Sequence, residues 1–385
     1  HGHSVLVQRG AGAQIGLSDE SYRIAGATLI NSAAEVFQKA EMIVKVKEPQ
    51  PQECAMLRED QILFTYLHLA PDPVQTKALL ASGATCIAYE TVTAMNGVLP
   101  LLAPMSEVAG RMSIQAAASH LEKTQGGLGV LMAGVPGVSP AKIVILGAGV
   151  VGRNALQMAV GLGADVCIFD RDIERLRQID MFYGNRVRTF YSDSLLIEQE
   201  VCEADVVIGA VLLHGAKAPH LIKKADLALM EAGTVVVDVA VDQGGCIETC
   251  KPTTHENPVF TIDNVIHYCV ANMPGAVPQT STRALTQATL PYAISIANKG
   301  WEKACAENPA LAKGLNIRAG KILHKGVADA LRPPGQTEIH IPDFAVHGQK
   351  QRAAVTGAVR LTAEPDVTGL THQAPVRALA QQATA

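Results

Sequence analysis

Three ionisable residues, Lys47, His68 and Asp242, each follow an apolar run that is typical of a buried strand. A lysine can bind a carboxylate or polarise a carbonyl, and a histidine can transfer a proton near neutral pH. An aspartate can hold an ammonium or stabilise a cationic intermediate. Each also has a purely structural interpretation: Lys47 could end a strand at the surface, His68 could hydrogen-bond within the fold, and Asp242 could serve only the turn at Gly244-Gly245.

The stretch 142–152 predicts a phosphate-binding turn. Its apolar run Lys142–Leu146 leads directly into G-x-G-x-x-G, formed by Gly147, Gly149 and Gly152. The first glycine allows a tight turn, the second lets backbone approach a pyrophosphate, and the third lets the next helix pack close to its strand. Amides at the start of that helix then face the phosphates.

Asp170 completes this pattern because it ends the next apolar run, about 20 residues after the glycines. Its carboxylate can accept both hydroxyls of an adenosine ribose and would repel a 2′-phosphate, so NAD is favoured over NADP. The neighbouring Arg171 weakens that preference. From the pattern alone, we predict an NAD-linked enzyme of two domains.

Strand and helix patterns alternate around these residues, which predicts a parallel, doubly wound sheet with ligands at the carboxyl ends of its strands. The expected strands are 142–146, 165–170, 186–191, 205–211, 234–240 and 265–270, and the expected helices between them are 153–162, 174–182 and 221–231. Asp238 lies inside one of these strands, and we expect it to form hydrogen bonds within the fold.

The first hundred residues predict a second α/β unit, with strands at 4–8, 41–46, 61–67 and 85–89. A long helix over about 283–299, capped by Thr280 or Ser281, can pack only if the chain returns to this unit. The predicted fold class is α/β, with two Rossmann-like domains: an NAD domain inserted in a discontinuous substrate domain, and the active site between them. The predicted divisions are 1–100 and 274–331 for the substrate domain, 101–273 for the NAD domain and 332–385 for a flexible tail.

The composition gives no sign of a nucleic-acid or membrane partner. The net charge of the 385 residues is −4, and 48% of them are hydrophobic. No apolar run approaches the ~20 residues that span a bilayer, and the start of the sequence lacks a signal-peptide pattern. The eight cysteines lack the paired spacing of a zinc site, so we expect reduced thiols in a cytoplasmic protein and no metal.

Longer motifs resemble the alanine dehydrogenase/transhydrogenase family, and in particular bacterial alanine dehydrogenases. The resemblance extends over about residues 2–331. The segments that carry it are 46–49 (VKEP), 63–70 (LFTYLHLA), 105–111 (MSEVAGR), 134–138 (GVPGV), 242–245 (DQGG) and 271–275 (ANMPG).

This resemblance implies reversible oxidative deamination of L-alanine to pyruvate and ammonia with NAD, in a homohexamer. It implies that Lys47 binds the substrate, that His68 contacts the substrate as proton donor and acceptor, and that Asp242 is a second catalytic residue. It also implies NAD contacts at Ser106, Val150, Val151, Asp170, Arg175, Ser192, Val211, Leu212, Val239, Ala240, Val241, Asp242, Val270, Ala271, Asn272 and Met273.

One departure from the family leaves other interpretations open. Members carry roughly thirty residues before the position of Gly2, with a first strand and an Arg that binds the substrate carboxylate, so we expect an unpaired sheet edge and weaker substrate binding. The chain could therefore be a catalytically silent NAD-binding oligomer, or the soluble NAD-binding subunit of a proton-translocating transhydrogenase. The pair Lys47 and His68, with Asp242-Gln243, favours the dehydrogenase.

Overall fold

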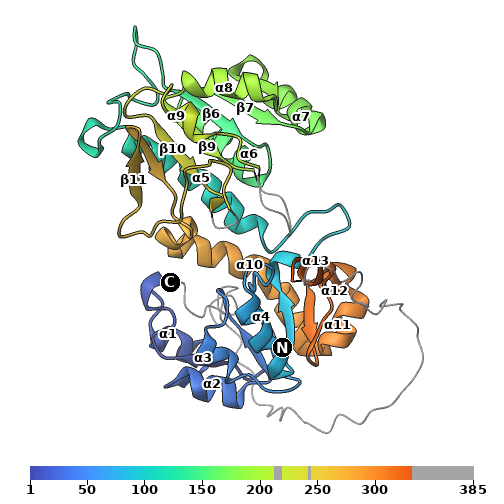
Figure 1. The fold of residues 1–385 in the computed structure, drawn as a ribbon. Coiled ribbons are helices and arrows are strands. Elements are labelled where there is room, and N and C mark those ends of the chain that lie inside the picture. The colour runs from blue at the N-terminus through green and yellow to red at the C-terminus, as the bar shows by residue number, and fades with distance from the viewer. Residues whose placement is uncertain (212–218, 242–243, 332–385) are drawn as a thin grey trace. The chain divides into compact units, whose positions relative to one another are not determined.

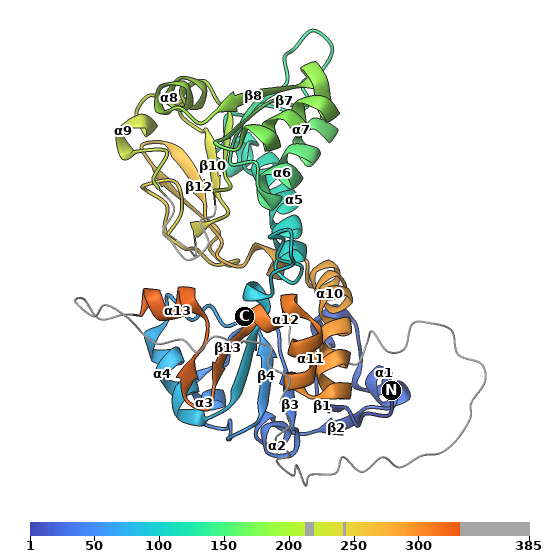
Figure 2. The same ribbon diagram turned by 90° about the vertical axis from the view of Figure 1, so that its right-hand side faces the viewer.

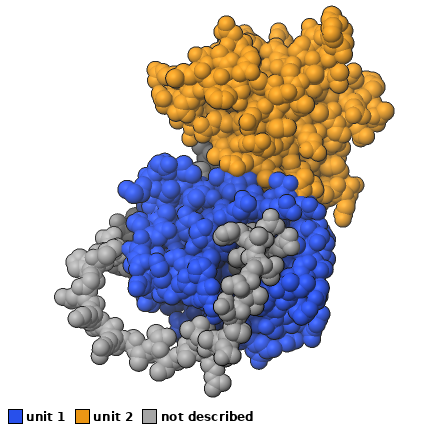
Figure 3. Space-filling model, turned by 180° about the vertical axis from the view of Figure 1, so that it is seen from behind, with its two compact units in different colours: residues 1–104, 278–385 blue, residues 105–277 orange. Residues whose placement is uncertain are grey.

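The computed structural model describes residues 1–211, 219–241 and 244–331 of the chain (Figure 1). It divides into two compact units (Figure 3). Unit 1 contains residues 1–104 and the residues from 278 on, and unit 2 contains residues 105–277. In the sequence, unit 2 therefore interrupts unit 1. No helix of the described ranges is long and apolar enough to cross a membrane.

Unit 2 is built on a seven-stranded sheet with the order β11-β12-β10-β9-β6-β7-β8. Every neighbouring pair is parallel except β11 with β12. The chain order reverses between β6 and β9, which is the switch point where doubly wound sheets bind ligands. The strands are β6 (Lys142–Leu146), β7 (Asp165–Asp170), β8 (Val187–Tyr191), β9 (Val206–Gly209), β10 (Val235–Asp238), β11 (Val259–Ile262) and β12 (Val265–Tyr268).

Alternate residues of each unit 2 strand enter two separate cores, because successive side chains of a strand point to opposite faces. Ile143 and Ile145 pack with helices α5, α6 and α7 on one face, whereas Val144 and Leu146 pack with α8 and the α9 region on the other (Figure 2). This two-sided burial explains the continuous apolar runs in the sequence. The helices are α5 (Ala103–His120), α6 (Val150–Gly161), α7 (Ile173–Tyr183), α8 (Ser194–Cys202) and α9 (Lys224–Leu227), the last shorter than predicted.

Unit 1 is built on a five-stranded sheet with the order β14-β13-β5-β4-β3, beside a separate parallel pair, β1 and β2. The central strands β3, β4 and β5 are parallel, and β13 joins β5 in the antiparallel direction. The strands are β1 (Leu6–Gln8), β2 (Thr28–Ile30), β3 (Met42–Val44), β4 (Ile62–Thr65), β5 (Thr85–Ala88), β13 (Leu315–Arg318) and β14 (Lys321–Ile322).

Helices cover both faces of the five-stranded sheet, with α4 and α13 on one side and α11 on the other (Figure 2). The long helix α10 begins at Pro278, so the predicted cap at Thr280 or Ser281 is wrong. Proline suits a first helical position because its φ is already helical. The helices are α1 (Asp19–Ile24), α2 (Ala33–Lys39), α3 (Pro51–Cys54), α4 (Pro73–Ser82), α10 (Pro278–Lys299), α11 (Trp301–Glu307), α12 (Pro309–Lys313) and α13 (Lys325–Ala330).

Candidate functional site

Three ionisable residues follow the carboxyl ends of three adjacent parallel strands in unit 1. Lys47 follows β3, His68 follows β4, and Glu90 follows β5 in a short 3-10 helix, η2 (Tyr89–Thr91). The carboxyl ends of neighbouring parallel strands lie at one edge of a sheet, and this is where α/β proteins bind ligands. The structure thus brings the two predicted residues, Lys47 and His68, to the same edge of the sheet and adds Glu90. Glu90 could have been predicted from the sequence, because it too follows an apolar strand.

The imidazole of His68 is paired with a carboxylate that the sequence analysis did not single out. Nδ1 of His68 forms a short hydrogen bond with Oε1 of Glu48, and the two side chains are 30% and 27% exposed. Burial alone would lower the pKa of His68, but the hydrogen bond to Glu48 and the charge of Glu90 raise it overall. Burial opposes ionisation of Glu48, yet His68 and Lys47 bring the pKa of Glu48 down to about 2. Glu48 is therefore ionised at neutral pH.

Glu90 holds the backbone that carries His68. Its carboxylate accepts the backbone N–H of Leu67 at 3.2 Å and that of His68 at 2.7 Å. His68 has a φ of +46°, a left-handed conformation that non-glycine residues adopt rarely and at a cost. The two bonds to Glu90 stabilise the local conformation from which the imidazole projects.

Lys45 and Lys47 are two residues apart on one chain segment, but only Lys45 forms an ion pair with a described residue. The ammonium of Lys45 forms an ion pair with Glu53, and both side chains are largely buried. Lys47 makes no side-chain hydrogen bond or ion pair with another described residue, while its carbonyl accepts the hydroxyl of Thr65 at 3.0 Å. Of the two, Lys47 is therefore the one whose charge is open to an anionic ligand.

The third predicted catalytic residue, Asp242, lies outside the described residues. Asp238, four positions earlier, is fully buried and accepts the backbone N–H groups of Ala240, Cys246 and Ile247 at 2.9–3.1 Å. Burial raises the pKa of Asp238 to about 6 against the effect of these bonds. The expectation that Asp238 forms hydrogen bonds inside the fold is confirmed.

The turn between β6 and α6 requires glycine at two positions. Gly147 has a φ of +103°, and a Cβ there would lie 2.8 Å from the carbonyl oxygen of Ala210. A Cβ on Gly152 would lie 1.7 Å from the carbonyl oxygen of Gly147, so only glycine lets α6 start this close to its strand. Gly149 is the N-cap of α6, has no side-chain cap and faces open space. Uncapped first-turn amides beside open space fit a diphosphate group.

Asp170 lies at the end of β7, where its carboxylate accepts the N–H of Ala148 at 2.6 Å and that of Asp172 at 2.8 Å. Nη1 of Arg175 approaches the same carboxylate at 3.7 Å, and the Arg175 side chain is 46% exposed. Asp170 therefore ties the glycine turn to the end of β7, and its side chain is 12% exposed. Arg171 is exposed.

Most of the other predicted cofactor residues follow the carboxyl ends of unit 2 strands. Ser192 follows β8 and donates its N–H to the carbonyl of Asp170 at 3.0 Å. Ser106 is the exception, because it lies on α5 rather than after a strand, and Leu212 lies outside the described residues. The remaining ones are Val150 and Val151 at the start of α6, Val211 after β9, Val239–Val241 after β10, and Val270–Met273 after β12.

These features define a two-unit α/β protein in which one unit has the strand order and glycine turn of dinucleotide-binding proteins. Two family models match it: "Alanine dehydrogenase/PNT, N-terminal domain" over residues 1–109 and "Alanine dehydrogenase/PNT, C-terminal domain" over residues 113–325. The chain belongs to the alanine dehydrogenase/PNT family, as its motifs predicted. The predicted α/β fold with Rossmann-like units is likewise confirmed.

Similar proteins of this family match most of the chain. Alanine dehydrogenase of Halomonas elongata is 55% identical, covering 86% of this chain and 89% of the relative, and that of Bacillus subtilis is 53% identical, covering 85% and 86%. A solved L-alanine dehydrogenase is 51% identical, with a TM-score of 0.82 over 86% of this chain and 91% of that one. A transhydrogenase from Sinorhizobium meliloti, 24% identical over 84% of this chain and 90% of that one, shares the fold with a TM-score of 0.70.

Proposed function

We propose that this protein is an oxidoreductase that catalyses the reversible oxidative deamination of L-alanine to pyruvate and ammonia with NAD. The observation that carries the proposal is the group at the carboxyl ends of β3, β4 and β5. It combines a histidine paired with an ionised carboxylate and a lysine without a described partner. Relatives more than 50% identical over most of the chain bear the name alanine dehydrogenase.

In this proposal each residue does what its chemistry allows. The ammonium of Lys47 binds the carboxylate or oxo group of the substrate, and His68 takes up protons as alanine becomes an imine and water adds to it. Asp242 assists the attack of water. When bound, NAD supplies the nicotinamide that accepts the hydride from the α-carbon. The overall balance converts alanine, water and NAD⁺ into pyruvate, ammonium, NADH and one proton.

We infer that NAD binds along the carboxyl ends of the unit 2 strands. The amides at the start of α6, which have no side-chain cap, would hold the pyrophosphate, and Asp170 would hold the adenosine ribose. The other NAD contacts that we propose are Ser106, Val150, Val151, Arg175, Ser192, Val211, Leu212, Val239–Asp242 and Val270–Met273.

One spectrophotometric assay tests the proposal. The purified chain should form NADH when L-alanine and NAD are supplied at alkaline pH, and NADP should replace NAD poorly. Binding of NAD without alanine-dependent NADH formation would identify a silent NAD-binding module. Hydride exchange between two nicotinamide coenzymes without alanine would instead support a transhydrogenase subunit. The likeness to the transhydrogenase from Sinorhizobium meliloti, at 24% identity, supports only the shared fold.

We further propose a homohexamer in the cytoplasm, following the resemblance to bacterial alanine dehydrogenases. The amino-acid composition, with a net charge of −4 and no bilayer-length apolar run, is compatible with this. Light scattering at micromolar concentration should give six times the mass of the chain, and a monomer would contradict the assembly.

A further inference from the structure

Two carboxylates approach His68 from two different elements, and their contacts differ in kind. Glu48, on the segment after β3, contacts the imidazole at Nδ1. Among the described residues, Glu90, in η2 after β5, accepts hydrogen bonds from the backbone N–H groups of Leu67 and His68 and from no side chain. Neither residue was among those that the sequence pattern assigned to the reaction.

The contact with Glu48 determines which nitrogen of His68 carries a proton. An ionised carboxylate can only accept hydrogen bonds, so Nδ1 must be the donor in the pair. When the imidazole is neutral, its lone pair is then on Nε2, as in enzymes where a carboxylate orients a catalytic histidine. The partner of one ring nitrogen thus selects the other as the site of proton exchange.

We propose that Glu48 is the positioning residue of His68: it keeps a proton on Nδ1 and so leaves Nε2 as the nitrogen that exchanges protons with the substrate. This inference rests on the proposed function, in which His68 transfers the proton. Glu90 has a separate task, because its two backbone bonds stabilise the left-handed conformation at His68.

The other groups that face His68 agree with this assignment. The ring of Tyr66 stacks on the imidazole with centroids 5.8 Å apart, and its hydroxyl donates to the carbonyl of Leu101 at 2.5 Å. Burial keeps the pKa of Tyr66 well above its ordinary value, so it stays neutral. The charges around the imidazole are therefore Glu48 and Glu90, which favour the imidazolium, and Lys47, which opposes it.

The test compares the full chain with Glu48→Gln and with a matched control, Glu53→Gln. Glu53 lies five positions away and pairs with Lys45 instead of His68. Histidine is labelled with ¹⁵N, and His68 is assigned by the signal lost in His68→Gln. In the parent, neutral His68 should be the Nδ1–H tautomer. In Glu48→Gln its pKa should fall by about one unit, and the low-pH limb of kcat/KM for deamination should move to lower pH with it.

We also expect Glu48→Gln to lower kcat about tenfold with little change in the KM for NAD, because a less basic imidazole accepts protons less readily. Glu53→Gln should leave the tautomer, the pKa of His68 and the pH profile unchanged. An Nε2–H tautomer in the parent, or a His68 titration that Glu48→Gln does not move, would overturn the inference. If Glu48→Gln fails to fold, the tautomer in the parent still decides.

The spectra and the assay can fail separately. If the spectra agree with expectation but no NADH forms from alanine, the control of His68 by Glu48 is supported and the proposed function is lost. If NADH forms and the tautomer is Nε2–H, the function stands and the role of Glu48 is rejected.

Discussion

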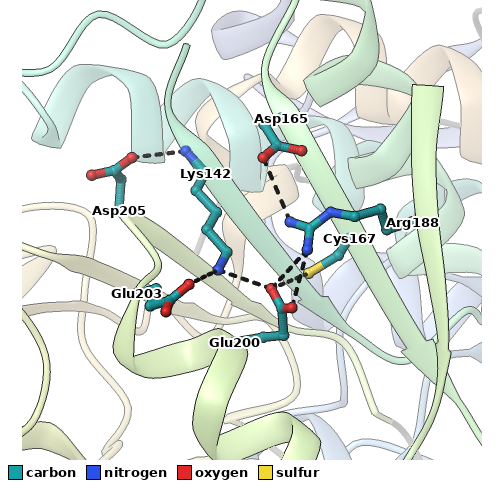
Figure 4. Close-up of polar contacts among 7 residues, drawn as sticks. All are labelled: Lys142, Asp165, Cys167, Arg188, Glu200, Glu203 and Asp205. Carbon is teal, nitrogen blue, oxygen red and sulfur yellow. Dashed lines mark hydrogen bonds and ion pairs between the residues drawn. The ribbon is translucent and has the colours of Figure 1, made fainter. Parts of the chain in front are cut away.

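Each unit has a group of charged side chains at one edge of its parallel strands. The group in unit 1 lies at the carboxyl ends of its strands, and the group in unit 2 lies at the amino ends. The carboxyl-end group of unit 1 consists of Lys47, Glu48, His68 and Glu90. The amino-end group of unit 2 lies where β6, β7 and β8 begin and on or just after α8 (Figure 4). Its members are Lys142, Asp165, Cys167, Arg188, Glu200, Glu203 and Asp205.

In the amino-end group, both cations are paired with anions. Lys142 contacts Glu200 at 2.9 Å and Glu203 at 2.8 Å, and Arg188 contacts Glu200 at 3.0 Å and Asp165 at 3.5 Å (Figure 4). Burial opposes the charge on Glu200, but Lys142 and Arg188 hold the pKa of that carboxyl below its usual value.

The thiol in this group is equally inert. Burial, with the neighbouring charge of Glu200, raises the pKa of Cys167 to about 12, so the thiol stays protonated. The pKa of Glu200 lies below its usual value, and the pKa values of Lys142 and Arg188 lie above theirs, so all three groups stay charged at neutral pH.

Charge density does not by itself identify an active site. The amino-end group is larger, yet both of its cations are paired, and these ion pairs cross-link β6, β7 and β8 to α8. The carboxyl-end group contains a histidine whose imidazole pairs with Glu48, which helps to raise its pKa, and a lysine that pairs with no described residue. A site for proton transfer needs such a group, at the strand ends where ligands bind.

The largest expected effect is on turnover. We predict that His68→Ala lowers kcat by at least about 10²-fold while the affinity for NAD stays nearly unchanged, because a positioned general base contributes 10²–10⁴-fold and the glycine turn lies in the other unit. Steady-state rates and NAD titrations measure the two quantities. If His68→Ala retains near-normal turnover, the carboxyl-end group is structural as well, and the contrast between the two groups disappears.

The next effect is on stability and tests the amino-end group. We predict that Glu200→Gln lowers the free energy of unfolding by about 2 kcal/mol, since it removes the anion that Lys142 and Arg188 share, whose side chain is 17% exposed, and leaves them only Glu203 and Asp165. Urea unfolding of the isolated variant measures this loss. The kcat of the folded variant should equal that of the parent. A large fall in kcat under conditions where the variant is fully folded would mean that this group takes part in function.

The pH dependence of that loss sharpens the assignment. Because the pKa of Glu200 is lowered in the folded state, its contribution is fully present above the ordinary value of 4.5 and is lost as pH falls through the folded value. The stability difference between the parent and Glu200→Gln should therefore be constant from pH 7 to about 5 and shrink below that. A difference that persists unchanged into acid would show that packing, and not charge, is responsible.

The smallest expected effect is on coenzyme preference, and it tests the two ends of one strand in the unit 2 sheet. Asp170 lies at the carboxyl end of β7, whereas Asp165 begins that strand in the amino-end group. We predict that NAD binds at least tenfold more tightly than NADP, about 1.4 kcal/mol, and that Asp170→Ala narrows this gap. Asp165→Ala is the control, and it should leave the ratio of the two affinities unchanged. Equal affinities of the parent for NAD and NADP would contradict the proposal that Asp170 binds the adenosine ribose.

Local pattern was enough to predict much of unit 2. The strands β6 and β7 have the predicted bounds, because strands buried on both faces need continuous apolar runs. The glycine turn was predicted for a similar reason: the backbone at Gly147 and Gly152 excludes any Cβ, so the residue type records the geometry. Lys47 and His68 were predicted to follow strands, and each follows one.

The partners of those residues depend on the tertiary fold. Glu48 and His68 are 20 positions apart, and Glu90 is 22 positions from His68, so their contacts depend on the order of β3, β4 and β5 in the sheet. The same holds for Lys45 and Lys47. The sequence does not distinguish them, whereas in the fold Glu53 forms an ion pair with Lys45. The strand β13, which follows unit 2 in the sequence and joins β5, was not among the predicted strands. A pattern of residues reports the backbone conformation that each segment can adopt, whereas partners, protonation and access to ligand depend on which segments the fold brings together.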